Sequence, residues 1–333
     1  NTVIDDVLAP GEEKTYEINK KAAEIAKRAV GEKALVAGSV GPTGQLLKPY
    51  GPVTFDELLE SYTLQIQGLV AGGADLLIIE TMSDLEEVKA AVIAAKNCCD
   101  LPLICSLTYD SQGRTMMGVS PEQAIYVLDP LGIHAIGANC SVGPEELLPL
   151  VKRMAQLTEL PIIVQPNAGL PILKGDKTIY REVPATMAQF AQRFVAAGAQ
   201  IVGGCCGTTP EHIRAIKEAV ADLKPVPRHK ERPVALAGRR KLLIFQSPQQ
   251  EVVVGRNFLT AAKAFETQLQ ELLKKSLAQI EGGAQVVAIV GDEALEGLWM
   301  AQAVLALQSQ YDVPVAIEAP GKDVVEAGLK AAK

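Results

Sequence analysis

Short apolar segments alternate with longer amphipathic segments from residue 34 through residue 220. The apolar segments are continuous runs rich in Val, Ile and Leu, which is typical of strands buried on both faces of a parallel sheet. The pattern predicts six strands, at residues 34–39, 75–80, 102–108, 135–140, 161–167 and 200–206.

Helix-start signals follow several of these strands. Ser83 with Glu86 fits a capping box, and the tripeptides at 120–122, 143–145 and 209–211 place Pro at a first helical position. Six consecutive strand–helix units are typical of an α/β barrel or a doubly wound sheet. In a barrel, the carboxyl ends of all strands face one opening, so residues that end different strands converge there.

A (β/α)8 barrel of the TIM type needs eight strands, and six are predicted before the pattern changes at Pro225. The chain opens with "NTVIDD", without an apolar strand ahead of the first predicted helix at residues 16–30. We therefore expect a barrel that lacks its first two strands.

The strand–helix pattern restarts after a segment rich in Pro and Arg, residues 224–240. Three further apolar runs, each followed by a helical pattern, predict the first three βα units of a second barrel. The expected domains are a first barrel at 1–225, a linker at 226–250 and a partial second domain at 251–333.

The amino-acid composition and the net charge exclude some classes of function. The chain has 333 residues, of which 48% are hydrophobic and 21% charged, and its net charge is −7. This charge argues against binding to nucleic acid or to anionic membranes. No apolar run is long enough to span a membrane and the start does not resemble a signal peptide, so a cytoplasmic protein is expected. In a reducing compartment, the six cysteines are interpreted as core residues, nucleophiles or metal ligands.

Two adjacent cysteines, Cys205 and Cys206, stand at the end of the sixth predicted strand. One interpretation is a pair of small buried residues. Neighbouring strand residues point to opposite faces, so both thiols can face one pocket only if the strand breaks, and the flanking glycines permit a break. The dipole of the helix that follows favours thiolates. A third cysteine, Cys140, ends another predicted strand.

Three thiols at one barrel opening match the ligand set of a catalytic zinc site with a free fourth position. Thiolates favour zinc over magnesium or calcium. With three thiolates the site has a formal charge of 2 − 3 = −1, which favours holding a substrate thiol as a nucleophilic thiolate over making hydroxide.

The other cysteines and two of the histidines do not point to the same opening. Cys98 and Cys99 lie in a helix-to-strand turn at the opposite end of the predicted barrel, and Cys105 is expected in the core. His134 lies on that far side and His212 in the first turn of a helix, where solvated or capping roles are expected. A covalent cysteine nucleophile is disfavoured because no histidine ends a strand nearby to act as its base.

Five segments together resemble one known family. They are "AGSVGPTG", "LLIIETMSDLEE", "GANCSVGPEE", "VQPNAGLP" and "GGCCGTTPEHI". The resemblance is to the homocysteine S-methyltransferase family, a zinc (β/α)8 barrel, and covers residues 1–225. The order of modules resembles the amino-terminal half of cobalamin-dependent methionine synthases, in which a pterin-binding barrel follows.

The resemblance implies roles for single residues. The implied zinc ligands are Cys140, Cys205 and Cys206. Glu80, in the "ET" motif, is implied to hold the amino group of homocysteine, as a carboxylate can. Asn139 and Asn167 are implied either to contact the substrate or to brace the loops. Ser39 and Thr108 are weaker candidates.

The implied reaction is zinc-dependent transfer of a methyl group to the thiol of homocysteine to give methionine, with the zinc-bound thiolate as nucleophile. Methylcobalamin on a corrinoid-carrying domain or protein is the expected donor; betaine and S-methylmethionine serve relatives. The alternative is an inactive fragment with a binding or structural role, because two family features are missing. The "LDGAMG"-like first strand is absent, and Val287 in "VAIVG" replaces an acidic residue of the pterin site, so folate binding is not expected of that part.

Overall fold

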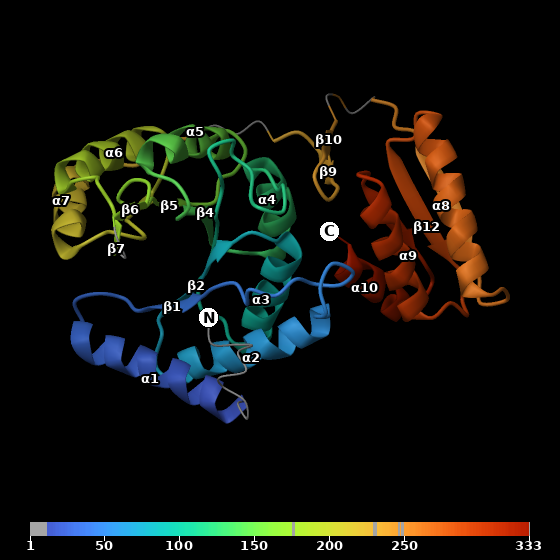
Figure 1. Ribbon diagram of the computed structural model, residues 1–333, viewed down its shortest axis with the longest axis horizontal. Coiled ribbons are helices and arrows are strands. Elements are labelled where there is room, and N and C mark those ends of the chain that lie inside the picture. The colour runs from blue at the N-terminus through green and yellow to red at the C-terminus, as the bar shows by residue number, and fades with distance from the viewer. Residues whose placement is uncertain (1–11, 175–176, 229–231, 246, 248–249, 333) are drawn as a thin grey trace. The chain divides into compact units, whose positions relative to one another are not determined.

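A computed structural model describes residues 12–174, 177–228, 232–245, 247 and 250–332 of the chain. The chain forms two compact units. The first unit comprises Asn1–Leu46 and Asp56–Arg232, and the second comprises Leu47–Phe55 and Pro233–Lys333. The opening "NTVIDD" lies outside the described residues. Each unit has its own sheet and its own helices (Figure 1).

The first unit is built on a six-stranded parallel sheet. Its strands are β1 (Ala37–Val40), β2 (Leu76–Met82), β3 (Leu103–Leu107), β4 (Ala135–Asn139), β5 (Ile162–Gln165) and β8 (Ile201–Val202). They pair in the order β1-β2-β3-β4-β5-β8, which is also their order along the chain. Figure 1 shows that the sheet curls. The predicted α/β class and the six parallel strands are confirmed, and the curl is consistent with a barrel of the TIM type.

Helices cover the outer side of this sheet as an arc (Figure 1). They are α1 (Glu12–Val30), α2 (Phe55–Ala71), α3 (Leu85–Cys98), α4 (Pro121–Leu128), α5 (Pro144–Ala155), α6 (Pro184–Ala196) and α7 (Pro210–Val220), with a short 3₁₀ helix at Asp129–Leu131. Four of them begin with Pro, whose fixed φ suits the first helical position.

Local signals predicted three helix starts correctly, those of α4, α5 and α7, whereas the first helix begins at Glu12 and not at residue 16. Ser120 caps α4 in a capping box with Gln123, and Gly143 and Thr209 precede the prolines that open α5 and α7. The predicted cap of α3 was wrong by one residue, because Asp84 and not Ser83 accepts the N–H of Glu86. Both residue types cap helices, so only the local backbone decides between neighbours.

Both faces of the sheet are buried along its central strands, β3 and β4, whereas one face of the edge strand β1 is exposed. Ile78, Ile104, Ala135 and Ile163 form a cluster on one face. Alternate strand residues point to opposite faces, so fully buried neighbours such as Leu77 lie on the other, against the helices. The prediction of strands with two covered faces is therefore confirmed for β3 and β4, and it is wrong for β1 and β8, whose residues are partly exposed.

A buried carboxylate anchors the loop that follows β1. Glu87, on α3, accepts hydrogen bonds from the backbone N–H and hydroxyl of Thr43, each at 2.7 Å, and from the Tyr62 hydroxyl at 2.9 Å. Burial, and then the nearby charge of Glu87, raise the pKa of Tyr62. The loop is thereby tied to α2 and α3.

The second unit contains three parallel strands, in the order β11-β12-β13. They are β11 (Val254–Leu259), β12 (Val286–Gly291) and β13 (Val315–Glu318), and each is followed by one of the helices α8 (Phe265–Glu281), α9 (Gly297–Gln310) and α10 (Lys322–Ala331). Val287 is fully buried in the core of this unit. Three βα units are present as expected, whereas their membership of a second barrel stays a prediction.

Two hairpins were not predicted from the sequence. The first joins β6 (Ile172–Lys174) and β7 (Lys177–Ile179) in the first unit. The second joins β9 (Ala235–Ala237) and β10 (Leu242–Ile244), inside the segment predicted as a linker. Strands of three residues are too short to show a clear alternation of apolar and polar positions, so pattern analysis misses them.

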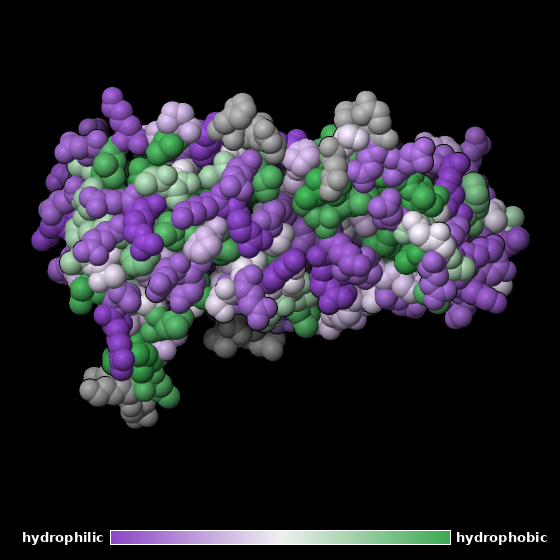
Figure 2. Space-filling model, turned by 90° about the horizontal axis from the view of Figure 1, so that it is seen from above, coloured by the Kyte–Doolittle hydropathy of each residue, from purple (hydrophilic) through white to green (hydrophobic). Residues whose placement is uncertain are grey.

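None of the described helices is both long enough and apolar enough to cross a membrane. On the face shown in Figure 2, hydrophobic residues are scattered among hydrophilic ones, which is the ordinary surface of a globular protein.

β4 and β5 approach each other closely at Gly137, where a Cβ atom would collide with the carbonyl oxygen and Cγ2 of Ile163. We expect Gly137→Ala to lower the free energy of unfolding by about 1–3 kcal/mol, because the strands must separate to admit the methyl group. Urea denaturation followed by circular dichroism measures this loss. Gly203→Ala is the control in the same unit, since its Cβ would lie 3.4 Å from Gln165 Cγ, an ordinary contact. Equal stability of the two variants would contradict the prediction.

Candidate metal centre

Three cysteine sulfurs meet at the carboxyl edge of the six-stranded sheet. Cys140 directly follows β4, and Cys205 and Cys206 follow β8. Their Sγ atoms all lie within 4.8 Å of one another, and those of Cys140 and Cys206 are 3.7 Å apart. Cys206 is exposed and the other two are partly buried. Within the part of the chain that the structure describes, no other trio of His, Cys, Asp or Glu side chains is grouped closely enough to hold a metal ion.

The cysteine pair lies beyond the end of its strand. β8 stops at Val202, and the next residues form a turn in which the Cys205 N–H donates to the Pro166 carbonyl at 2.8 Å. Gly207 has a φ of +79°, and a Cβ there would collide with the Tyr180 ring. The turn lets two adjacent side chains face the same space, which a regular strand does not allow.

A strained backbone carries the third sulfur. Cys140 and Ser141 have φ angles of 61° and 60°, in the left-handed region that residues other than Gly seldom adopt. The Cys140 N–H donates to the carbonyl of Gln165 on β5 at 3.1 Å. Such strain gathers at functional sites, where the surrounding structure holds it in place.

Two buried asparagines brace the centre. Asn139 is fully buried; its Oδ1 accepts from the Thr81 N–H at 3.0 Å and from the Ser106 hydroxyl at 2.9 Å. Its Nδ2 donates to Thr81 Oγ1 at 2.8 Å and approaches Cys205 Sγ at 3.8 Å. Asn167 accepts the Cys206 N–H at 3.0 Å. These contacts correspond to the bracing role, one of the two roles that the sequence left open.

The sulfurs influence one another's protonation. The pKa of Cys140 falls to about 5, chiefly because the Cys205 thiol donates a hydrogen bond to its sulfur, while partial burial opposes the shift. The same hydrogen bond, together with burial, raises the pKa of Cys205. Cys140 and Cys205 therefore favour one shared negative charge, and a cation bound between their sulfurs would favour the loss of a second proton.

A carboxylate stands at the same edge of the sheet. Glu80, near the end of β2, accepts a hydrogen bond from Ser39 Oγ at 2.6 Å. The next residue, Thr81, has a φ of 61°, and the β2–β3 register shifts between Ile79 and Met82. Thr108, a weaker candidate, lies just beyond β3, and within the described structure its buried Oγ1 has no hydrogen-bond partner.

Sequence reasoning missed Thr81 and Ser106 as partners of Asn139. Thr81 belongs to the "ETM" segment, but no sequence feature reports a left-handed φ at a threonine. Ser106 lies inside an apolar strand and is fully buried. A single polar residue inside such a run is a weak signal for a buried hydrogen bond.

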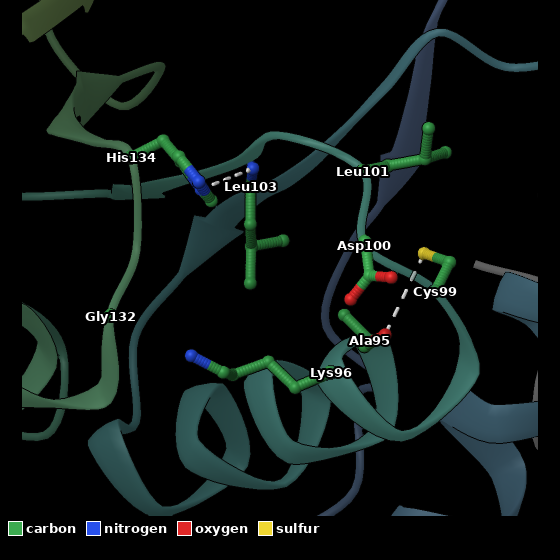
Figure 3. A pocket seen from close by; sticks show the side chains of 8 residues that line it. All are labelled: Ala95, Lys96, Cys99, Asp100, Leu101, Leu103, Gly132 and His134. Carbon is green, nitrogen blue, oxygen red and sulfur yellow. Dashed lines mark hydrogen bonds between the residues drawn. The ribbon is translucent and has the colours of Figure 1, made fainter.

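The opposite edge of the sheet holds the residues that the sequence placed there. Cys99 and His134 line a pocket there (Figure 3), whose volume is about 200 Å³. The Cys99 thiol lies 3.6 Å from the Ala95 carbonyl oxygen, and His134 Nδ1 accepts the Leu103 N–H at 3.1 Å. Both side chains thus serve local structure at the edge away from the three sulfurs.

Cys105 and His212 also have structural surroundings. Cys105 is fully buried in β3, and this burial raises its pKa. His212 accepts the Thr209 N–H through Nδ1 at 3.2 Å, and its Nε2 lies 2.9 Å from the Glu182 carbonyl oxygen. These contacts match the core and capping roles expected from the sequence.

The chain is similar to known proteins in both sequence and structure. The model of the family described as homocysteine S-methyltransferase matches residues 3–220. The methionine synthase of Mycobacterium tuberculosis is 30% identical over 336 residues, which cover 94% of this chain. The chain spans 28% of the length of that relative.

Solved structures agree with the sequence comparison. The apo form of the Escherichia coli homocysteine methyltransferase MmuM matches with a TM-score of 0.51 and 27% identity, over 62% of this chain and 74% of that one. Its metallated form matches with a TM-score of 0.52 and 26% identity, over 62% of this chain and 72% of that one. The chain therefore belongs to the homocysteine S-methyltransferase family.

Proposed function

We propose that this chain transfers a methyl group to the thiol of homocysteine, giving methionine, at a zinc centre held by its three clustered cysteines. The observation that carries the proposal is the convergence of three sulfurs within 4.8 Å at the carboxyl edge of the sheet. Membership of the family supports the reaction class, and the metallated relative supports a metal.

The donor set fits zinc. Thiolates are soft ligands that favour Zn²⁺, and three protein ligands leave a position for substrate. Cys140, Cys205 and Cys206 would hold the ion, while Asn139 and Asn167 keep their sulfurs in place. Bound there, Zn²⁺ would supply a centre of formal charge 2 − 3 = −1, which keeps a substrate thiol deprotonated yet nucleophilic near neutral pH.

The chain's own residues orient the substrate. In the proposal, Glu80 binds the ammonium group of homocysteine, and the Ser39 hydroxyl holds one carboxylate oxygen in position. The substrate sulfur uses an electron pair to form a bond to the methyl carbon. The bond from that carbon to the donor breaks at the same time, and the donor group leaves with its electron pair.

A corrinoid is the proposed methyl donor. The resemblance to methionine synthase supports methylcobalamin carried by another domain or protein, since this chain spans only 28% of that relative. The second candidate function is a binding role without catalysis. A chain that binds zinc and homocysteine but transfers no methyl group from methylcobalamin would support that second role.

The ligand assignment predicts a metal stoichiometry. Wild-type chain dialysed against Zn²⁺ should retain one zinc per chain, and Cys206→Ala should lose it, because two thiolates cannot complete the site. Elemental analysis of the dialysed protein measures both. Cys105→Ala is the matched control, since this cysteine is fully buried and does not belong to the cluster of three. Stoichiometric zinc in Cys206→Ala would overturn the assignment.

The role of Glu80 predicts a loss of substrate affinity. We expect Glu80→Gln to weaken homocysteine binding by about 10- to 100-fold at neutral pH, because the ammonium group loses its charged partner. Calorimetric titration of the zinc-loaded protein measures the change. The matched ligand is 4-mercaptobutyrate, which lacks the amino group and should bind both proteins equally. Unchanged homocysteine affinity in Glu80→Gln would contradict the proposed role.

A further inference from the structure

Asn139 links the two parts of the site that would hold opposite ends of the substrate. Through Nδ2 it approaches Cys205 Sγ at 3.8 Å, at the sulfur end. Its Oδ1 accepts a hydrogen bond from the Thr81 backbone N–H at 3.0 Å, and its Nδ2 donates one to the Thr81 hydroxyl oxygen at 2.8 Å. Thr81 directly follows Glu80, at the ammonium end.

The position of Glu80 depends on how Thr81 is held. Thr81 has a φ of 61°, and the β2–β3 register shifts at this point, so the regular ladder does not fix the local backbone. The two hydrogen bonds from Asn139 take over that task, and Ser106 from β3 holds the same amide oxygen at 2.9 Å. Asn139 is fully buried, so water does not compete for these bonds.

A substrate that is held at both ends binds well only if its length matches the distance between the two protein groups that hold it. Homocysteine carries its thiol one methylene further from the ammonium group than cysteine does. If the span between Glu80 and the three sulfurs suits homocysteine, cysteine cannot satisfy both ends at once. Rejecting a ligand that lacks one methylene is worth about 10- to 200-fold.

We propose that Asn139 is the positioning residue that sets this span and thereby makes the site prefer homocysteine over cysteine. The inference rests on the proposed function, because it takes Glu80 and the cysteine cluster as the two ends of the binding site. Asn139 acts through Thr81 and Cys205 and does not itself touch the substrate.

Four variants test the proposal. Asn139→Asp keeps the acceptor oxygen but loses the Nδ2 donor, and Asn139→Ala loses both. Thr81→Val removes only the hydroxyl that Asn139 holds, and Thr81→Ser keeps it. Asn257→Ala is the matched control, because Asn257 is also buried in a strand and hydrogen-bonded, at 3.1 Å to Ser276 and 2.9 Å to Gln279, but in the second unit.

The readout is the ratio of the dissociation constants of L-cysteine and L-homocysteine, measured by calorimetry on zinc-loaded protein. This ratio needs no methyl donor. Zinc affinity is measured separately by competition with a chelator. We expect the Asn139 variants to bind zinc about 10- to 100-fold more weakly, which is the usual effect of mutating a residue that hydrogen-bonds to metal ligands. If Asn139 had a merely structural role, its variants would bind zinc, or both L-cysteine and L-homocysteine, more weakly, but the ratio of the two dissociation constants would not change.

The wild type should favour homocysteine by about 10-fold or more. Asn139→Asp, Asn139→Ala and Thr81→Val should bring the ratio toward one, whereas Thr81→Ser and Asn257→Ala should keep it. An unchanged ratio in Thr81→Val and in every Asn139 variant that folds would overturn this inference alone. Failure of the wild type to bind either thiol would instead overturn the proposed function, and this inference with it.

Discussion

Three sulfur atoms within 4.8 Å of one another would repel one another if all carried negative charge, and a cation bound among them would offset that repulsion. The pKa values of Cys140 and Cys205 move in opposite directions, chiefly because the Cys205 thiol donates a hydrogen bond to the Cys140 sulfur, so that Cys140 takes the charge and Cys205 keeps its proton. Much of the local structure serves to hold this otherwise unfavourable arrangement. The strand that carries the cysteine pair stops early, and the residue that carries the third sulfur adopts a left-handed backbone.

The strain at the site is distributed over neighbouring strands. Thr81, Cys140 and Ser141 each have a φ close to 60°, and a non-Gly residue in this region costs on the order of 1–3 kcal/mol. Hydrogen bonds across strands stabilise these conformations: Asn139 holds Thr81, and the Gln165 carbonyl accepts the Cys140 N–H. A parallel sheet suits this arrangement because it brings the carboxyl ends of distant chain segments to one edge. The same constraint joins a proposed ammonium site to a proposed metal site through one buried amide.

Much of the first unit's fold was predictable from pattern alone. Continuous apolar runs marked all six strands, and in the central strands β3 and β4 they do so because both faces are covered. Proline marked the starts of α4, α5 and α7 because its φ suits that position. The cap of α3 was placed one residue early, and the hairpins β6–β7 and β9–β10 were missed. These features depend on local backbone angles or on three-residue strands, which leave little periodic signal.

The sequence by itself determined which chemical groups stand at the strand ends. Cysteine at 140, 205 and 206, and glutamate at 80, follow apolar runs, and a parallel sheet sends such positions to one edge. Only the tertiary structure decided how these groups face one another: the break after β8, the left-handed turn at Cys140 and the contacts of Asn139 with Thr81, Ser106 and Cys205. These contacts join segments far apart in the chain. Their geometry depends on sheet register and side-chain packing, which local sequence patterns do not encode.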